Sequence, residues 1–106
     1  MRSQERKYTL HQLCDAVCIA SGLKYEHLFG KDKDIAHIIP RAVFYMLARE
    51  YGYLFVEIAN YTKRNHSTCV NVSKRYKGYY EVKDPAVCNF VAQVKQILSQ
   101  ASDNND

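Results

Sequence analysis

Apolar residues recur at intervals of three and four along most of the chain, and this spacing predicts helices. The first stripe consists of Leu10, Leu13, Cys14, Val17 and Cys18. Thr9, followed three residues later by Gln12, forms a capping-box pattern in front of this stripe, and Gly22 is expected to end the helix. A short second helix is expected between Lys24 and Phe29, stopped by Gly30.

The middle and the end of the chain continue the helical pattern. Pro40 suits the first turn of a third helix, which is expected to reach Gly52 with Val43, Phe44, Leu47, Ala48 and Tyr51 on one face. Two helices follow, from residue 54 to 61 and from residue 66 to about 76, with a break at residues 62–64 and Asn65 as the cap. Asp84 and Pro85 begin the last helix, whose apolar stripe is Val87, Phe90, Val91, Val94, Ile97 and Leu98. A short extended piece is expected at residues 79–82.

These elements predict an all-α domain of five to six helices. The domain is expected to span residues 1–98, with a helix-turn-helix at about residues 54–77 and a disordered tail at 99–106. A chain of 106 residues with 47% hydrophobic residues has one ordinary core. The charged N-terminus and the lack of a long apolar run predict a cytoplasmic protein without a membrane partner.

The basic residues are unevenly distributed. The net charge is +4, yet residues 60–83 hold six basic residues and one acidic residue, an excess of +5 that leaves the remainder at −1. In the second helix of the expected pair, Ser67, Asn71 and Lys74 share one face. Two helices, a tight turn and a basic second helix are the ingredients of a helix-turn-helix that reads duplex DNA in the major groove.

The residues of this segment resemble a known family. The run Glu57-Ile58-Ala59, then Lys63-Arg64-Asn65-His66-Ser67-Thr68, and finally Lys74-Arg75 resembles the C-terminal duplex-binding domain of the bacterial replication initiator DnaA. Upstream, Pro40-Arg41 and the run from Tyr45 to Glu50 resemble the proline helix of that family. The likeness covers roughly residues 10–98, nearly the whole expected domain.

The resemblance implies a Trp-repressor-like fold that binds double-stranded DNA, with a role linked to replication or regulation and a place at the nucleoid. It implies base contacts by the residues at the start of the second helix, which are Asn65, His66, Ser67 and Thr68. It implies a phosphate contact for Arg41, and Lys63, Arg64, Lys74 and Arg75 are the further candidates for phosphate contact.

This sequence departs from the family pattern in three ways, which limit the family properties that we expect of it. Asn65 stands where the family has a base-reading aspartate, and a carboxamide suits adenine, so the preferred site is expected to differ. The loop of residues 31–37 sums to zero charge where the family has arginines for the minor groove. The chain also lacks an ATPase region, so we do not expect it to initiate replication by itself. A lone copy is expected to bind at about 10⁻⁶ to 10⁻⁵ M, which would require a dimer or another protein to add affinity.

Each candidate DNA-contacting residue also has a structural interpretation. Asn65 is interpreted either as a helix cap or as a base contact, and Arg41 either binds phosphate or pairs with Glu50 or Asp34. Lysine and arginine side chains of the basic helix either bind phosphate or are simply solvated. The alternative function is a protein-interaction adaptor that keeps the DnaA-like fold without specific DNA binding.

No chemistry other than binding is predicted. The sequence has no interpretable nucleophile and base pair and no glycine-rich phosphate loop, so we expect neither an enzyme nor a small-molecule substrate or cofactor. The four cysteines are expected to pack in the core. His11, Cys14 and Cys18 could be considered zinc ligands, but the chain has no C-x-x-C pair, and no metal site is predicted.

Overall fold

The computed structural model describes residues 7–30 and 37–103, and these residues form an all-α fold. Its helices are α1 (Leu10–Ser21), α2 (Tyr25–Leu28), α3 (Ile38–Glu50), α4 (Phe55–Thr62), α5 (His66–Glu81) and α6 (Pro85–Asp103). The described residues contain no strand, which confirms the all-α class. None of these helices is both long enough and apolar enough to cross a membrane.

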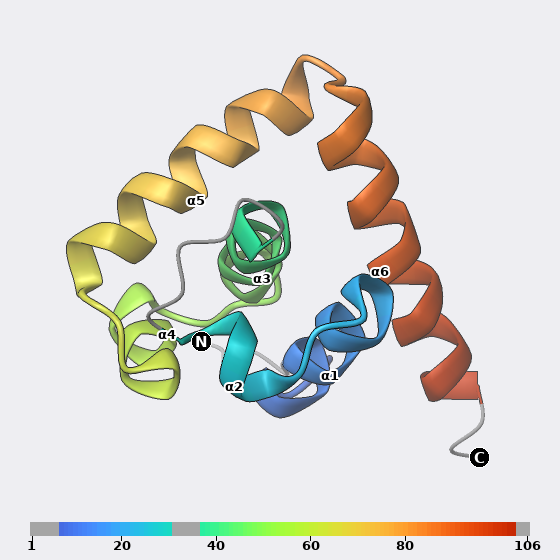
Figure 1. The fold of residues 1–106 in the computed structure, drawn as a ribbon, viewed down its shortest axis with the longest axis horizontal. Coiled ribbons are helices and arrows are strands. Elements are labelled where there is room, and N and C mark those ends of the chain that lie inside the picture. Colours follow the sequence, from blue (N-terminus) through green and yellow to red (C-terminus); the bar gives the residue numbers. More distant parts are fainter. Residues whose placement is uncertain (1–6, 31–36, 104–106) are drawn as a thin grey trace.

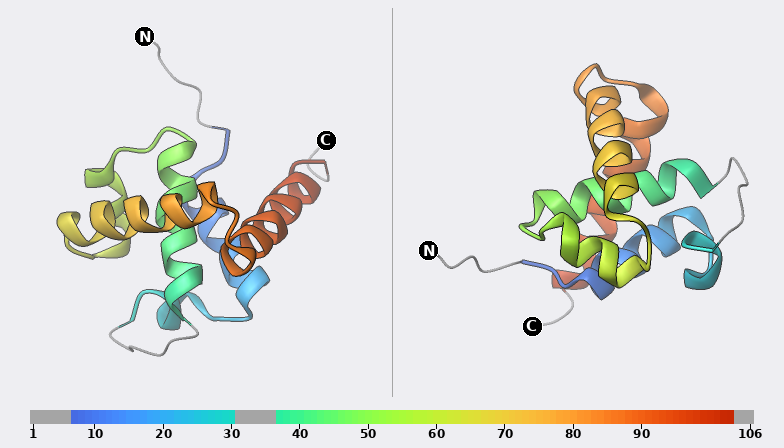
Figure 2. Two further views of the ribbon diagram at one scale, coloured as in Figure 1. Left: turned by 90° about the horizontal axis from the view of Figure 1, so that it is seen from above. Right: turned by 90° about the vertical axis from the view of Figure 1, so that its left-hand side faces the viewer.

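Helix α3 lies at the centre of the fold. It is seen end-on in Figure 1, with α1, α4, α5 and α6 around it. Figure 2 shows α5 crossing over α3. The sequence predicted one apolar face for α3, but every residue from Ala42 to Ala48 is buried. A helix that is covered on all sides buries its whole circumference, and α3 is therefore the scaffold for the other helices.

The expected caps of α1 and α6 are confirmed. Thr9 Oγ1 accepts the Gln12 N–H at 3.0 Å, and Gln12 Oε1 accepts the Thr9 N–H at 2.8 Å. Gly22 follows α1 with φ of 77°, a left-handed conformation that glycine adopts without strain. Asp84 Oδ2 accepts the Val87 N–H at 3.2 Å and so caps α6. The boundaries of these helices thus follow from local side-chain chemistry.

The apolar stripe of α6 closes the core. Val87, Val91, Val94 and Leu98 are buried, and α6 packs mainly on α1 and also on α3. Phe90 and Ile97 are partly buried beside them. The predicted stripe is therefore confirmed, since all six of its residues lie in the core or pack against it.

Helices α5 and α6 extend further than expected, and Thr62, expected in the break, belongs to α4, whereas the start of α3 is as predicted. Helix α5 runs to Glu81, so the extended piece expected at residues 79–82 is wrong. Helix α3 begins at Ile38, which leaves Pro40 within the first turn, where its missing N–H is tolerated. Helix α6 continues to Asp103, so residues 99–103 of the expected disordered tail are helical. Residues 104–106 of that tail, and residues 31–36 of the loop with zero net charge, lie outside the described residues.

Candidate nucleic-acid interface

Helices α4 and α5 are joined by a three-residue turn, residues 63–65. Thr62 Oγ1 donates to the Ile58 carbonyl oxygen at 2.9 Å within the last turn of α4. Lys63 then adopts the left-handed conformation with φ of 56°, and the Arg64 N–H donates to the Ala59 carbonyl oxygen at 3.1 Å. This geometry reverses the chain sharply, and it matches the short connection of a helix-turn-helix.

Asn65 is the N-cap of α5. Its Oδ1 accepts the Ser67 N–H at 2.8 Å, and its carbonyl oxygen accepts the Cys69 N–H at 3.1 Å. The capping interpretation of Asn65 is therefore confirmed. Because Oδ1 is turned toward the helix backbone, the carboxamide does not present both its oxygen and its nitrogen to solvent.

The first turn of α5 is open to solvent. His66, Ser67 and Thr68 are all exposed, as the hypothesis of base contact requires. The His66 ring lies edge-on to the Phe55 ring, with 6.3 Å between centroids. The Arg49 guanidinium lies 5.5 Å from the centre of the same Phe55 ring. These contacts connect the start of α5 to α3 and α4 and leave Ser67 and Thr68 outward.

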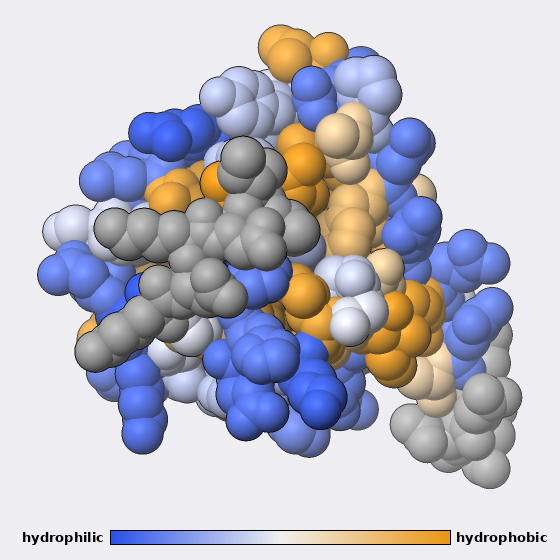
Figure 3. All heavy atoms as spheres, in the orientation of Figure 1, coloured by the Kyte–Doolittle hydropathy of each residue, from blue (hydrophilic) through white to orange (hydrophobic). Residues whose placement is uncertain are grey.

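The rotation of α5 is fixed by its buried residues. Cys69 and Ser73 face the core, so the side chains on the opposite face point outward. That outward face carries Ser67, Thr68, Asn71, Lys74 and Arg75, all of them exposed. Figure 3 shows hydrophilic surface along the outer edge of α5.

The cations near this face are available for a ligand. Lys63, Lys74 and Arg75 are exposed, and none of them joins an ion pair among the residues that the structure describes. The acidic residue of α5, Glu81, lies in its last turn, far along the helix from Ser67. The start of α5 is thus polar and positively charged.

Arg41 and Arg64 differ from the other candidate cations because both bind backbone carbonyls at the end of α2. Arg41 Nε donates to the Leu28 carbonyl oxygen at 2.7 Å, and its Nη2 donates to that of Gly30 at 3.3 Å. Arg64 Nη2 donates to the carbonyl oxygens of Phe29, at 2.9 Å, and of Gly30. We call these two residues and their carbonyl partners the arginine clamp.

The arginine clamp gives both residues a structural role that the sequence did not indicate. The last carbonyls of a helix lack intrahelical partners and carry partial negative charge, which a guanidinium neutralises. Arg64 belongs to the turn before α5 and Arg41 to α3, so the clamp joins both to the end of α2. Of the two carboxylates considered as partners of Arg41, Glu50 pairs with Lys95 at 3.3 Å, and Asp34 lies outside the described residues. Phosphate contact by the two arginines stays a prediction.

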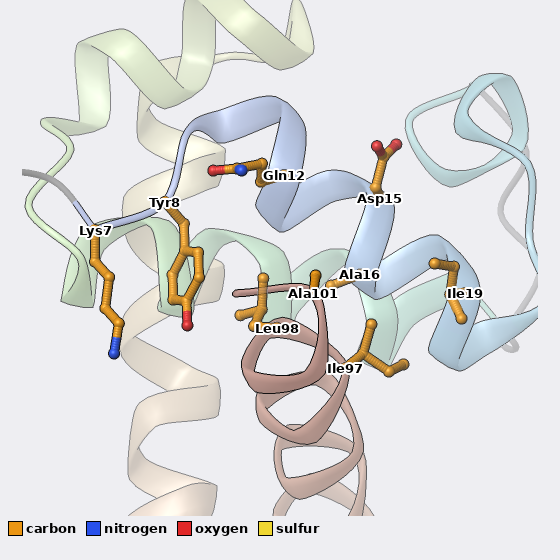
Figure 4. Close-up of a pocket in the computed structure, with 9 residues that line it drawn as sticks. All are labelled: Lys7, Tyr8, Gln12, Asp15, Ala16, Ile19, Ile97, Leu98 and Ala101. Carbon is orange, nitrogen blue, oxygen red and sulfur yellow. The ribbon is translucent and has the colours of Figure 1, made fainter. Parts of the chain in front are cut away.

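A hollow lies between α1 and the end of α6, away from α5, and Figure 4 shows the residues around it. It measures about 320 Å³, and its polar residues are Lys7, Gln12 and Asp15. Gln12 belongs to the capping box, Asp15 lies 3.4 Å from His11, and Lys7 Nζ lies 5.6 Å from the centre of the Tyr8 ring. Each of these three side chains therefore already has a local contact, and the hollow is assigned no ligand.

Two of the four cysteines lie in the core as the sequence predicted, whereas Cys18 packs half-buried against the core and Cys88 is only half-buried. Cys14 and Cys69 are buried, and burial, with a smaller contribution from Cys18, raises the pKa of the Cys14 thiol to about 12. Among residues 7–30 and 37–103, no group of three or more histidine, cysteine or acidic side chains is arranged to hold a metal ion.

We compared the chain with protein-family models and with curated protein sequences. No protein-family model matches the chain, and no curated protein sequence matches it.

Proposed function

We propose that the protein binds double-stranded DNA with sequence preference, by placing α5 in the major groove. The observation that carries the proposal is the exposed polar first turn of α5, continuous with a cationic outward face and held on α4 by a three-residue turn. The resemblance of these residues to the DnaA duplex-binding domain supports the same function, with a role in replication or regulation.

The dimensions and charges of α5 suit this mode of binding. An α-helix fits the width of the major groove, and 16 residues give a length of about 24 Å. The free N–H groups of the first turn attract phosphate, and Lys63 stands beside them. Lys74 and Arg75 are two turns further along, within reach of the backbone on the other side of the groove.

The proposed contacts divide by function. His66, Ser67 and Thr68 contact bases, and Lys63, Lys74 and Arg75 contact phosphates. Asn65 fixes the start of α5. Arg41 and Arg64 hold the turn in place through the arginine clamp, which contributes to DNA binding indirectly, beside the phosphate contact predicted for them.

Titration of duplex DNA at several salt concentrations tests the proposal. Each phosphate contact contributes about 0.9 to the slope of log affinity against log salt. Lys74→Ala is therefore expected to reduce the slope by about 0.9 and to weaken binding to all sequences equally. Lys7→Ala is the matched control, because it removes the same charge beside α1 and leaves α5 untouched.

Two results would contradict the proposal. If Lys74→Ala and Lys7→Ala change the slope equally, the charge of the whole protein and not the α5 face governs binding. If no duplex shifts the amide resonances of residues 65–77 even at low salt, the protein does not bind DNA, and capture of a protein partner would support the adaptor alternative.

A further inference from the structure

The capping bond of Asn65 bears on which residue reads adenine. Asparagine recognises adenine when its oxygen accepts from N6 while its nitrogen donates to N7, so both atoms must point into the groove. In this structure Asn65 Oδ1 is held 2.8 Å from the Ser67 backbone nitrogen. Turning that oxygen to a base would leave the first turn of α5 without its cap.

A second asparagine stands on the same helix without this restriction. Asn71 is exposed, and its carboxamide makes no hydrogen bond with any residue that the structure describes. Both the oxygen and the nitrogen of its side chain are therefore free to bind one base edge together.

The position of Asn71 on α5 is suited to reading a base. It follows Ser67 by four residues and precedes Lys74 by three, so the three side chains share the outward face. Four residues of helix advance about 6 Å, close to two base-pair steps. Asn71 is thus positioned to contact the base pair about two steps from the one that Ser67 contacts. Lys74 and Arg75 lie on the following turn of α5.

We propose that Asn71, and not Asn65, is the adenine-reading residue of this protein. The inference rests on the proposed function, because it assigns a specificity-determining residue within the same interface. Asn65 then contributes to affinity only by fixing the start of α5.

Three variants separate the two asparagines. Asn71→Ala removes the carboxamide and places a better helix former on the surface, so the fold is retained. Asn65→Ser removes the other carboxamide but keeps a side-chain oxygen for the cap. Asn89→Ala, at an exposed position on α6, controls for the loss of an exposed asparagine elsewhere.

The experiment selects duplexes from a random pool with the wild-type protein and then measures the affinity of each variant for the selected site and its single-base changes. Asn71→Ala is expected to reduce the preference for adenine at one position by about tenfold or more, while preferences elsewhere persist. The wild-type protein should lose a similar factor when 7-deazaadenine, which lacks the N7 acceptor, occupies that position. Asn65→Ser and Asn89→Ala should keep the preference.

The opposite outcomes are distinguishable. If the wild-type protein selects a site and Asn65→Ser loses the adenine preference while Asn71→Ala keeps it, the assignment is wrong and the proposed function stands. A selected site at which neither variant alters the preference also overturns the assignment alone. If the wild-type protein selects no sequence, the proposed function fails and the assignment fails with it.

Discussion

Removal of Arg64 is the perturbation that best separates structure from DNA contact in this interface. Arg64 Nη2 donates to the carbonyl oxygens of Phe29 and Gly30, whereas the adjacent Lys63 is exposed and has no hydrogen bond of this kind among the described residues. Arg64→Ala leaves both carbonyls with fewer donors, and it removes one of the two arginines that attach the end of α2 to the helix-turn-helix.

The expected loss in the free energy of unfolding follows from these hydrogen bonds. A hydrogen bond from a charged donor contributes about 1.5–3 kcal/mol. The two carbonyls share one nitrogen of a half-buried side chain, so we expect a loss near the low end, about 2 kcal/mol in the free energy of unfolding. With a urea dependence of about 2 kcal/mol per molar, the midpoint of unfolding should fall by about 1 M.

Urea denaturation followed by far-ultraviolet circular dichroism measures this change. Lys63→Ala removes the same charge from the neighbouring residue and should alter stability by less than about 0.5 kcal/mol. Arg41→Ala should be destabilising like Arg64→Ala, and the double variant should lose less than the sum because both donate to Gly30. Equal stabilities of Arg64→Ala and Lys63→Ala would refute the arginine clamp.

Other predictions concern stability. Gly78→Ala should stabilise the protein by about 0.5–1 kcal/mol in urea, because a Cβ there meets no atom within 4 Å and alanine favours the helix; unchanged or lower stability would contradict this. Asp84→Ala should cost about 1 kcal/mol through loss of the α6 cap, with Asp84→Ser recovering most of it. The pKa of the Cys14 thiol is about 12 in the folded protein, against an ordinary value of 9.0. As the pH rises, the thiol therefore loses its proton in the unfolded state before it does so in the folded state. The contribution of Cys14 to stability should be constant below about pH 9 and fall from there toward about pH 12, so the total loss of stability over this range should be shallower in Cys14→Ala. An identical decline in that variant would disprove the assignment.

The local parts of the fold were predictable because neighbouring residues determine them. Thr9 with Gln12, Asn65 and Asp84 are all capping residues that act within three positions of themselves in the chain. The same locality allowed the outward face of α5 to be predicted, since Ser67, Asn71 and Lys74 follow from helical spacing alone. The core-facing stripe of α6 was predictable for the same reason.

The long-range parts were not predictable in this way. Arg64 and the carbonyl of Gly30 are separated by 34 positions in the sequence, and no periodicity relates them. The contacts of Arg41 and Arg64 with the end of α2 could therefore not be predicted, and phosphate contact by these arginines stays a prediction. The burial of α3 on all sides also depends on how the other helices pack, and its spacing alone indicated one face. The length of α5 was underestimated because its last turn contains tyrosines, which favour strands about as readily as helices.

The selection of duplexes from a random pool by the wild-type protein tests the central claim most directly. We predict a short enriched site that contains adenine. Binding of this site should shift the amide resonances of residues 65–77, and the affinity of the protein for it should fall with rising salt. Recovery of a pool with no enriched sequence would contradict the claim that α5 reads DNA.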